Sequence, residues 1–152
     1  MRTVFRSAAA LAVCVLAAGV VQAAEPRAVA IAGNDAMQFS VKRIEVKAGE
    51  SIKIALSASG AMPKAEMAHN WVLLAKGTDP MQFAMAAAMA RDTGYIPAAK
   101  KSAILAMTPG LIGAGEKSEV VFTAPKEPGS TPAIRTFPGH FIGGMKGVLI
   151  VK

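Results

Sequence analysis

The sequence predicts an all-β fold, a Greek-key β-sandwich of about eight short strands with one short helix. Two observations predict it. Short apolar segments, several with strict alternation of apolar and polar residues, recur along the chain between Gly, Pro and Asp turn signals. Only one stretch, residues 78–94, combines a helix start with a helix-like run. Many short strands separated by turns are typical of a sandwich.

Residues 1–24 are predicted to be a secretory signal peptide, and residues 25–152 a single domain. Two arginines precede the apolar run 8–21, and the small-residue segment 21–23 follows it as a cleavage site. The run is too short for a membrane span. Cys14, the one cysteine, lies within it, so the mature chain would carry no thiol; lipid attachment at Cys14 stays open as an alternative. We therefore expect a periplasmic protein without a transmembrane segment.

The charge pattern bears on the partners. The chain has 17 basic and ten acidic residues, and removal of the signal peptide leaves a net charge of about +5. The basic residues are scattered rather than clustered, which does not favour nucleic-acid binding. A scattered positive charge fits solubility and weak steering toward acidic partners.

The first half of the domain contains three predicted strands. Residues 29–33 are an apolar run that the turn signal "GND" closes. In residues 39–59, Ile44 and Val46 alternate with charged residues, an Ala-Gly turn follows, and three aliphatic residues alternate after it. These are two half-buried strands joined by a tight turn. The segment "HNWVLLA" is a further strand.

The second half begins with the helix. Asp79 and Pro80 open it, and Gly94 is predicted to stop it. The cluster "PKEPGSTP" is predicted to be a turn. The remaining strands are predicted in "SAILAM", "SEVVFTA", "AIRTF" and "MKGVLIVK".

Two histidines and a methionine are the candidate metal ligands. His69 and His140 flank loops at strand ends, and such loops meet at one end of a sandwich. Met145 adds a thioether, and two imidazoles with a thioether suit copper better than zinc, magnesium or calcium. The plain alternative is two surface histidines and a core methionine.

The segments "GNDAMQF", "HNWVLLA", "LIGAGEKSEV" and "TFPGH…MKG", with "MQ" opening the helix, occur in this order. In these the chain resembles the azurin-like cupredoxins from about Ile31 to Lys152. The resemblance implies an eight-stranded sandwich with a helical flap after the fourth strand. It also implies periplasmic electron carriers with a copper ion held by two His, one Cys and weak axial groups. His69 and His140 match the imidazole ligands, and Met145 resembles the axial methionine with a His-to-Met spacing one residue longer.

The chain differs from the family at the position of the cysteine that supplies the thiolate ligand. Arg135 stands at the cysteine position, Ala68 at the position of a glycine whose carbonyl is a weak axial group, and Asn70 at the asparagine that ties the ligand loops together. An arginine side chain has no lone pair to donate to a metal ion, and it keeps its proton. If its head points inward it opposes a metal ion; if it points to water the ion is only held less well. We expect the inward orientation, with hydrogen bonds to Asn70 or to the Ala68 carbonyl.

Two apolar sets carry alternative roles. A helix-face methionine row either packs the helix on the sandwich, which we expect, or offers thioethers to cuprous copper. A second set either forms an apolar rim around His140, which docks partners in the family that the chain resembles, or is plain core; we expect it to be partly exposed. The row is Met81, Met85 and Met89, and the rim is Leu111, Ile112, Phe141 and Ile142.

No catalytic arrangement is visible, so the chain is not expected to be an enzyme. Three functions remain open. The first is copper handling through His69, His140 and Met145 without a blue thiolate site. The second is a metal-free module in which Arg135 fills the old site and the rim contacts a protein. The third is electron transfer as in the parent family. The expected partner is a periplasmic redox or copper-handling protein.

Overall fold

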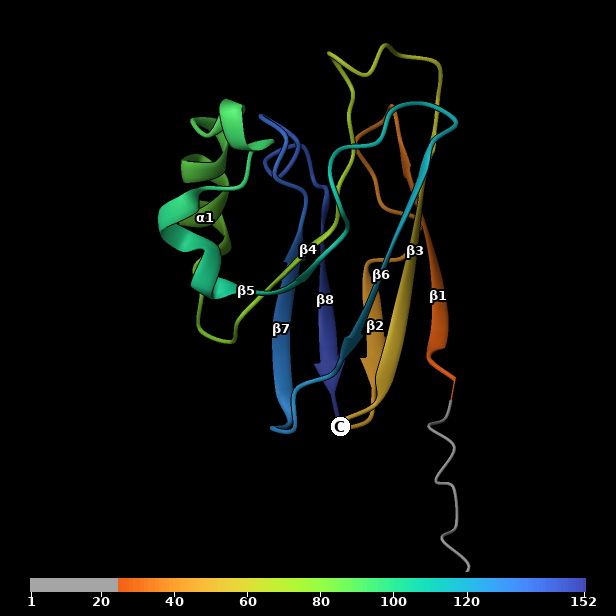
Figure 1. The fold of residues 1–152 in the computed structure, drawn as a ribbon, viewed down its shortest axis with the longest axis vertical. Helices are drawn as coiled ribbons and strands as arrows, with labels where there is room; N and C mark the ends of the chain where they lie inside the picture. The colour runs from red at the N-terminus through yellow and green to blue at the C-terminus, as the bar shows by residue number, and fades with distance from the viewer. Residues whose placement is uncertain (1–24) are drawn as a thin grey trace, which may run out of the picture.

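The computed structural model describes residues 25–152 (Figure 1). The predicted signal peptide and Cys14 lie outside the described residues. Within residues 25–152, no helix is long and apolar enough to cross a membrane. The elements in chain order are β1 (Arg27–Asn34), β2 (Arg43–Val46), β3 (Ser51–Ser59), β4 (Val72–Leu74), α1 (Pro80–Ala88), two 3-10 helices (Arg91–Thr93 and Ala98–Ala103), β5 (Ile104–Met107), β6 (Lys117–Thr123), β7 (Gly129–Ile134) and β8 (Lys146–Val151).

The strands form two sheets, which confirms the predicted all-β sandwich. One sheet has the order β1-β3-β6 and the other the order β2-β8-β7-β4-β5. The two sheets lie face to face, and α1 lies outside the second sheet, beside β7 (Figure 1). β2 and β3 are consecutive in sequence but belong to different sheets. The chain crosses between the sheets at Gly49, whose φ of 73° is a conformation that glycine adopts without strain.

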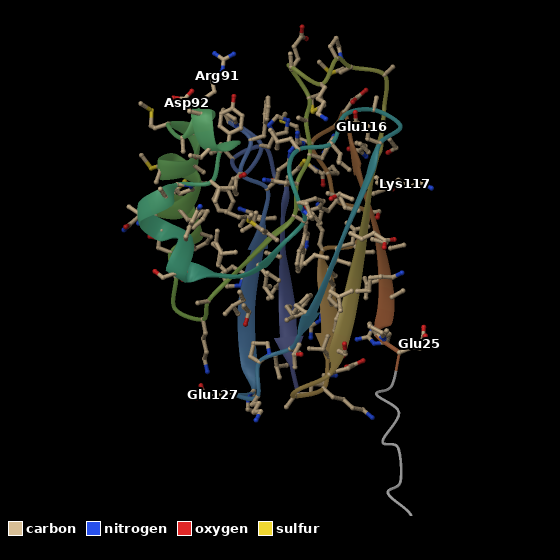
Figure 2. All side chains as sticks on the ribbon, in the orientation of Figure 1. Glu25, Arg91, Asp92, Glu116, Lys117 and Glu127 are labelled. Atoms are coloured by element: carbon tan, nitrogen blue, oxygen red, sulfur yellow. The ribbon has the colours of Figure 1, made fainter. Side chains whose placement is uncertain are left out.

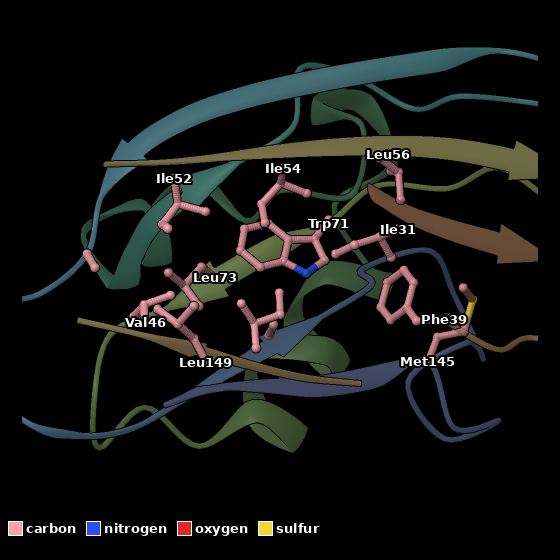
Figure 3. Packing of buried hydrophobic residues seen from close by; sticks show 14 of the residues in the cluster. Ile31, Phe39, Val46, Ile52, Ile54, Leu56, Trp71, Leu73, Met145 and Leu149 are labelled. Atoms are coloured by element: carbon pink, nitrogen blue, oxygen red, sulfur yellow. The ribbon is translucent and has the colours of Figure 1, made fainter. Parts of the chain in front are cut away.

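The core fills the space between the sheets. In β3 the residues alternate between half-buried and buried, so that Ile52, Ile54 and Leu56 all point inward. Figure 3 shows these side chains around Trp71, with Met145 beside Phe39 at one end of the cluster. The alternation was the basis for predicting the strand, and its cause is this one-sided burial.

Two boundaries differ from the prediction. The helix ends at Ala88, and Gly94 instead closes the following 3-10 turn with a φ of 64°. β7 begins at Gly129, inside the predicted turn cluster, and ends at Ile134. Pro132 is tolerated there because β4 pairs only with Ala133 and Ile134, so no ladder bond to β4 is lost at the proline.

The methionine row on α1 does not pack on the sandwich, so that expectation is wrong. Met81, Met85 and Met89 are 43%, 64% and 88% exposed. The packing face of the helix is formed by Phe83 and Ala87, which are fully buried. Residues two positions apart on a helix lie on nearly opposite sides, so burial of Phe83 turns the methionines outward.

Two substitutions on α1 are expected to separate these faces. Phe83→Ala should lower the free energy of unfolding by about 3–5 kcal/mol, because it removes a buried aromatic ring. Met85→Ala should change it by less than about 0.5 kcal/mol, as for other exposed positions. Urea denaturation measures both. Equal losses in the two variants would contradict the packing of the helix through Phe83.

Candidate functional site

His69 is held by backbone pairing just before β4. Its N–H donates to the Ile112 carbonyl at 2.7 Å, and the Ile112 N–H donates back to the His69 carbonyl at 2.8 Å. The ring is 1% exposed and lies against Gly33, where an added Cβ would stand 2.4 Å from Nδ1. Any residue other than glycine at position 33 would therefore displace the His69 ring. Nδ1 of His69 is buried and has no hydrogen-bond partner among the described residues.

His140 and Met145 are positioned by the loop between β7 and β8. The Arg135 N–H donates to the Met145 carbonyl at 3.2 Å, and the Met145 N–H donates to the His140 carbonyl at 2.9 Å. His140 Nδ1 lies 2.8 Å from the Pro138 carbonyl, and its Nε2 lies 2.9 Å from the sulfur of Met67. These contacts close the loop over one end of the sandwich.

Asn70 and Thr136 join the two loops. The Asn70 amide donates to the Thr136 hydroxyl at 2.7 Å, and the Thr136 N–H donates to the Asn70 side-chain oxygen at 3.1 Å. Both residues are buried. The Asn70 side chain thus fixes the segment before β4 against the segment after β7, and both of its hydrogen bonds go to Thr136 rather than to Arg135.

Arg135 lies inside the molecule, at the same end as Met67 and Met145. Its side chain is fully buried. Nη1 lies 2.8 Å from the Met145 sulfur and 3.9 Å from the Met67 sulfur, and the guanidinium carbon is 5.4 Å from the centre of the Phe137 ring. The inward orientation is the expected one, but the expected partners are not found, since Asn70 bonds Thr136 instead.

The structure brings most of the candidate residues to one end. His69, His140, Met145, Arg135 and Asn70 converge there, and Ala68 is buried beside His69 in the chain. Met67 belongs to the same group and was missed by the sequence analysis. Its only sequence signal is its place two residues before His69.

The expected rim is only partly a surface. Ile112 and Phe141 are buried, and only Ile142, 76% exposed, faces the solvent fully. Ile112 belongs to the main core, and Phe141 packs with Phe83 and its neighbours beneath α1. Leu111 is half-buried. The rim around His140 is therefore smaller than the sequence indicated.

The electrostatics of this end are dominated by one cation. Burial lowers the pKa of Arg135 to about 9, which leaves it charged at neutral pH. Burial, and after it the charge of Arg135, lowers the pKa of His69 from 6.5 to about 4. The same two causes lower the pKa of His140. Both imidazoles are therefore neutral at pH 7.

The pKa of His69 makes stability depend on pH. Between pH 6.5 and pH 4 the unfolded chain protonates His69 while the folded chain does not, so stability is lost as the pH falls through this window. We expect a loss of about 3 kcal/mol from this residue. Urea denaturation from pH 7 to pH 4 measures it, with His69→Gln as the control. If the control loses as much stability as the parent, this assignment to His69 is wrong.

The possible copper ligands at this end are already engaged or opposed by a charge. His69 Nδ1 has no hydrogen-bond partner among the described residues, but His140 Nε2 faces Met67 and the Met145 sulfur faces the guanidinium. A cation about 4 Å from a divalent ion opposes it by roughly 8 kcal/mol at an effective dielectric of 20. With Arg135 in this position, the residues at this end do not fit a copper ion.

Comparisons with known proteins agree on one family. Residues 27–152 match the model of the copper binding proteins of the plastocyanin/azurin family. The chain is 35% identical to azurin of Pseudomonas fluorescens biotype A, over 82% of this chain and 97% of that protein. It is 39% identical to azurin of Pseudomonas aeruginosa, over 80% and 95%. The solved structure of auracyanin A, a "blue" copper protein from Chloroflexus aurantiacus, matches with a TM-score of 0.72 at 30% identity, covering 84% of this chain and all of that one.

Proposed function

This chain belongs to the plastocyanin/azurin family of copper-binding proteins, and from that premise we propose that it is a periplasmic member that works as a metal-free binding module. One observation carries the proposal. Arg135 is completely buried at the position where the resemblance puts the thiolate. Its Nη1 contacts the Met145 sulfur, so this sulfur is not available to a metal. A site built to hold a metal cation is here filled by a protein cation. Blue electron transfer requires the thiolate that is missing.

The surface for a partner lies between α1 and the loop after β7. A groove of about 100 Å³ lies there, lined by Met81, Met85 and Ala88 on the helix and by Phe137 and Ile142 on the loop. Met85 and Ile142 are 64% and 76% exposed. Exposed methionine and aliphatic side chains beside a groove are the kind of adaptable apolar surface that proteins bind.

A second function, copper handling, has its own supporting observation. His69, His140, Met145 and the additional Met67 converge on one end, and imidazole with thioether donors suits cuprous copper. It requires the Arg135 head to leave the pocket. The outer methionines Met81, Met85 and Met89 are a separate thioether candidate that does not require this movement.

Metal analysis of the protein recovered from the periplasm distinguishes these functions. The chain, expressed with its own residues 1–24 in copper-supplemented medium, should be recovered from the periplasm by osmotic shock. We expect no bound copper and no reversible redox wave in voltammetry. Stoichiometric copper would favour copper handling, a reversible wave would favour electron transfer, and retention in the cytoplasm would contradict the predicted location.

A photo-crosslinking amino acid at position 142 tests the contact surface. We expect a discrete cross-linked product in the periplasm from position 142. The control position is Val121 on β6, which is apolar and 54% exposed but lies away from the groove. Equal products from both positions, or none from position 142, would contradict the proposed surface.

A further inference from the structure

The guanidinium of Arg135 has two unused hydrogen-bond donors. Nε and Nη2 are buried and have no partner among the described residues, while Nη1 is engaged with sulfur. In a planar guanidinium, the N–H of Nε and one N–H of Nη2 point the same way and form one edge of the fork. That edge is the one that binds anions with two parallel hydrogen bonds. The free donors are therefore not scattered but form a single binding edge.

No protein carboxylate neutralises this cation. All ten acidic residues of the chain lie in residues 25–152, and none of them is buried. None of the five salt bridges between described residues includes Arg135, and Figure 2 shows the labelled carboxylates of Glu25, Asp92 and Glu127 on the outside of the molecule. Asp35 is partly exposed and accepts a hydrogen bond from the Ala61 N–H at 2.8 Å.

The remaining contacts of Arg135 do not replace a counter-ion. Thioether sulfur is a weak acceptor, and the Phe137 ring offers only its quadrupole. A buried charge is normally paired, because an unpaired one in a low-dielectric interior costs several kcal/mol. A buried group with no partner in a native fold calls for a water or an ion that completes it.

We propose that the former copper pocket binds one small monoanion of chloride size on the Nε–Nη2 edge of Arg135. The small size follows from the burial of the guanidinium, which is fully buried, with Nη1 against the Met67 and Met145 sulfurs and the guanidinium carbon 5.4 Å from the Phe137 ring centre. A halide fits this better than a larger oxyanion because it needs few atoms of space and has no fixed directions of bonding. The substitution at position 135 thus turns a cation site into an anion site. This inference rests on the proposed metal-free pocket.

Thermal unfolding at constant ionic strength tests the proposal. Sodium gluconate is replaced stepwise by sodium chloride, and then by sodium bromide, with the metal-free parent chain. A ligand that binds only the folded state raises Tm, by about 4 °C for each tenfold rise in chloride above its Kd. We expect this rise in the parent and none in Arg135→Met or Arg135→Gln. Arg91→Met, which removes an exposed arginine, is the matched control and should keep the rise.

Several results would overturn the proposal. The first is an equal Tm of the parent in gluconate and chloride, which would leave a buried water as the partner of Arg135. The second is an unchanged chloride effect in both Arg135 variants, which would place the effect elsewhere. Anomalous scattering from bromide-soaked crystals should place one bromide beside Arg135, and its absence there would also count against the proposal. Copper uptake by the parent in gluconate would contradict the metal-free function instead, and the chloride series without copper would still stand as a separate result.

Discussion

Arg135→Cys is expected to convert the chain into a protein that binds Cu(II) tightly and absorbs strongly in the visible range. The change removes the buried cation that opposes the metal and supplies a thiolate in one step. Copper binding deprotonates the new thiol, as it does for coordinating thiols generally. Removal of the guanidinium also frees the Met145 sulfur, which Nη1 contacts at 2.8 Å in the parent. Absorption spectra with equimolar Cu(II) measure the result.

The control for this rebuild is Arg135→Ala, which removes the same cation without supplying a thiolate. It should bind Cu(II) more weakly and stay pale. The longer spacing between His140 and Met145 is expected to shift the colour of the cysteine variant from blue toward green. If the cysteine variant shows no strong thiolate-to-copper band, His69 and His140 have moved out of ligand geometry, and the copper-handling hypothesis then loses its main support.

Arg135→Met is expected to raise the free energy of unfolding by about 1–4 kcal/mol in buffer without halide, the range seen when buried charges are replaced by well-packed apolar groups. The methionine has a similar length, and the neighbours Met67, Met145 and Phe137 present sulfur and an aromatic face to it. Urea denaturation measures the difference from the parent.

The difference in free energy of unfolding between Arg135→Met and the parent should shrink when chloride is added, because the anion stabilises only the parent. A variant that is less stable than the parent in halide-free buffer would show that the contacts of the guanidinium outweigh the cost of its burial. In that case Arg135 would be a stabilising part of the core.

The sequence was sufficient to predict the strands that have one buried face. β3 was predictable because Ile52, Ile54 and Leu56 alternate with polar residues, and the cause of that alternation is burial on one side. β7 was partly missed because Gly129, Ser130 and Pro132 carry turn preferences, whereas the pairing with β8 decides the structure there. Propensity describes a residue alone, and tertiary pairing overrides it.

Periodicity could not tell which side of α1 faces the sheet. The methionine row and the pair Phe83 and Ala87 both repeat at four-residue spacing, so both are consistent with a packing face. In the structure, the side with the larger aromatic ring of Phe83 is the buried one. The deciding quantity is the shape of the space between the helix and β7, which is not encoded in the helix segment itself.

The candidate site was predictable in its members more than in its contacts. His69, His140 and Met145 could be proposed from loop positions and from the resemblance, and so could the inward orientation of Arg135. Its contacts could not, because Asn70 bonds Thr136 and the guanidinium contacts the Met145 sulfur instead. Met67 has no distinguishing pattern and is recognised from its sulfur, which lies 2.9 Å from His140 Nε2 and 3.9 Å from Arg135 Nη1.

The measurement that tests the central claim most directly is a copper titration of the unmodified mature chain, in gluconate buffer, with Cu(II) and with Cu(I) under reducing conditions. Gel filtration followed by metal analysis gives the copper retained per chain, and His69→Ala and His140→Ala are carried alongside. If Arg135 closes the pocket, the parent retains no more copper than either variant, and the spectrum shows no visible band. Retention of one copper per parent chain, lost in both histidine variants, would contradict the claim.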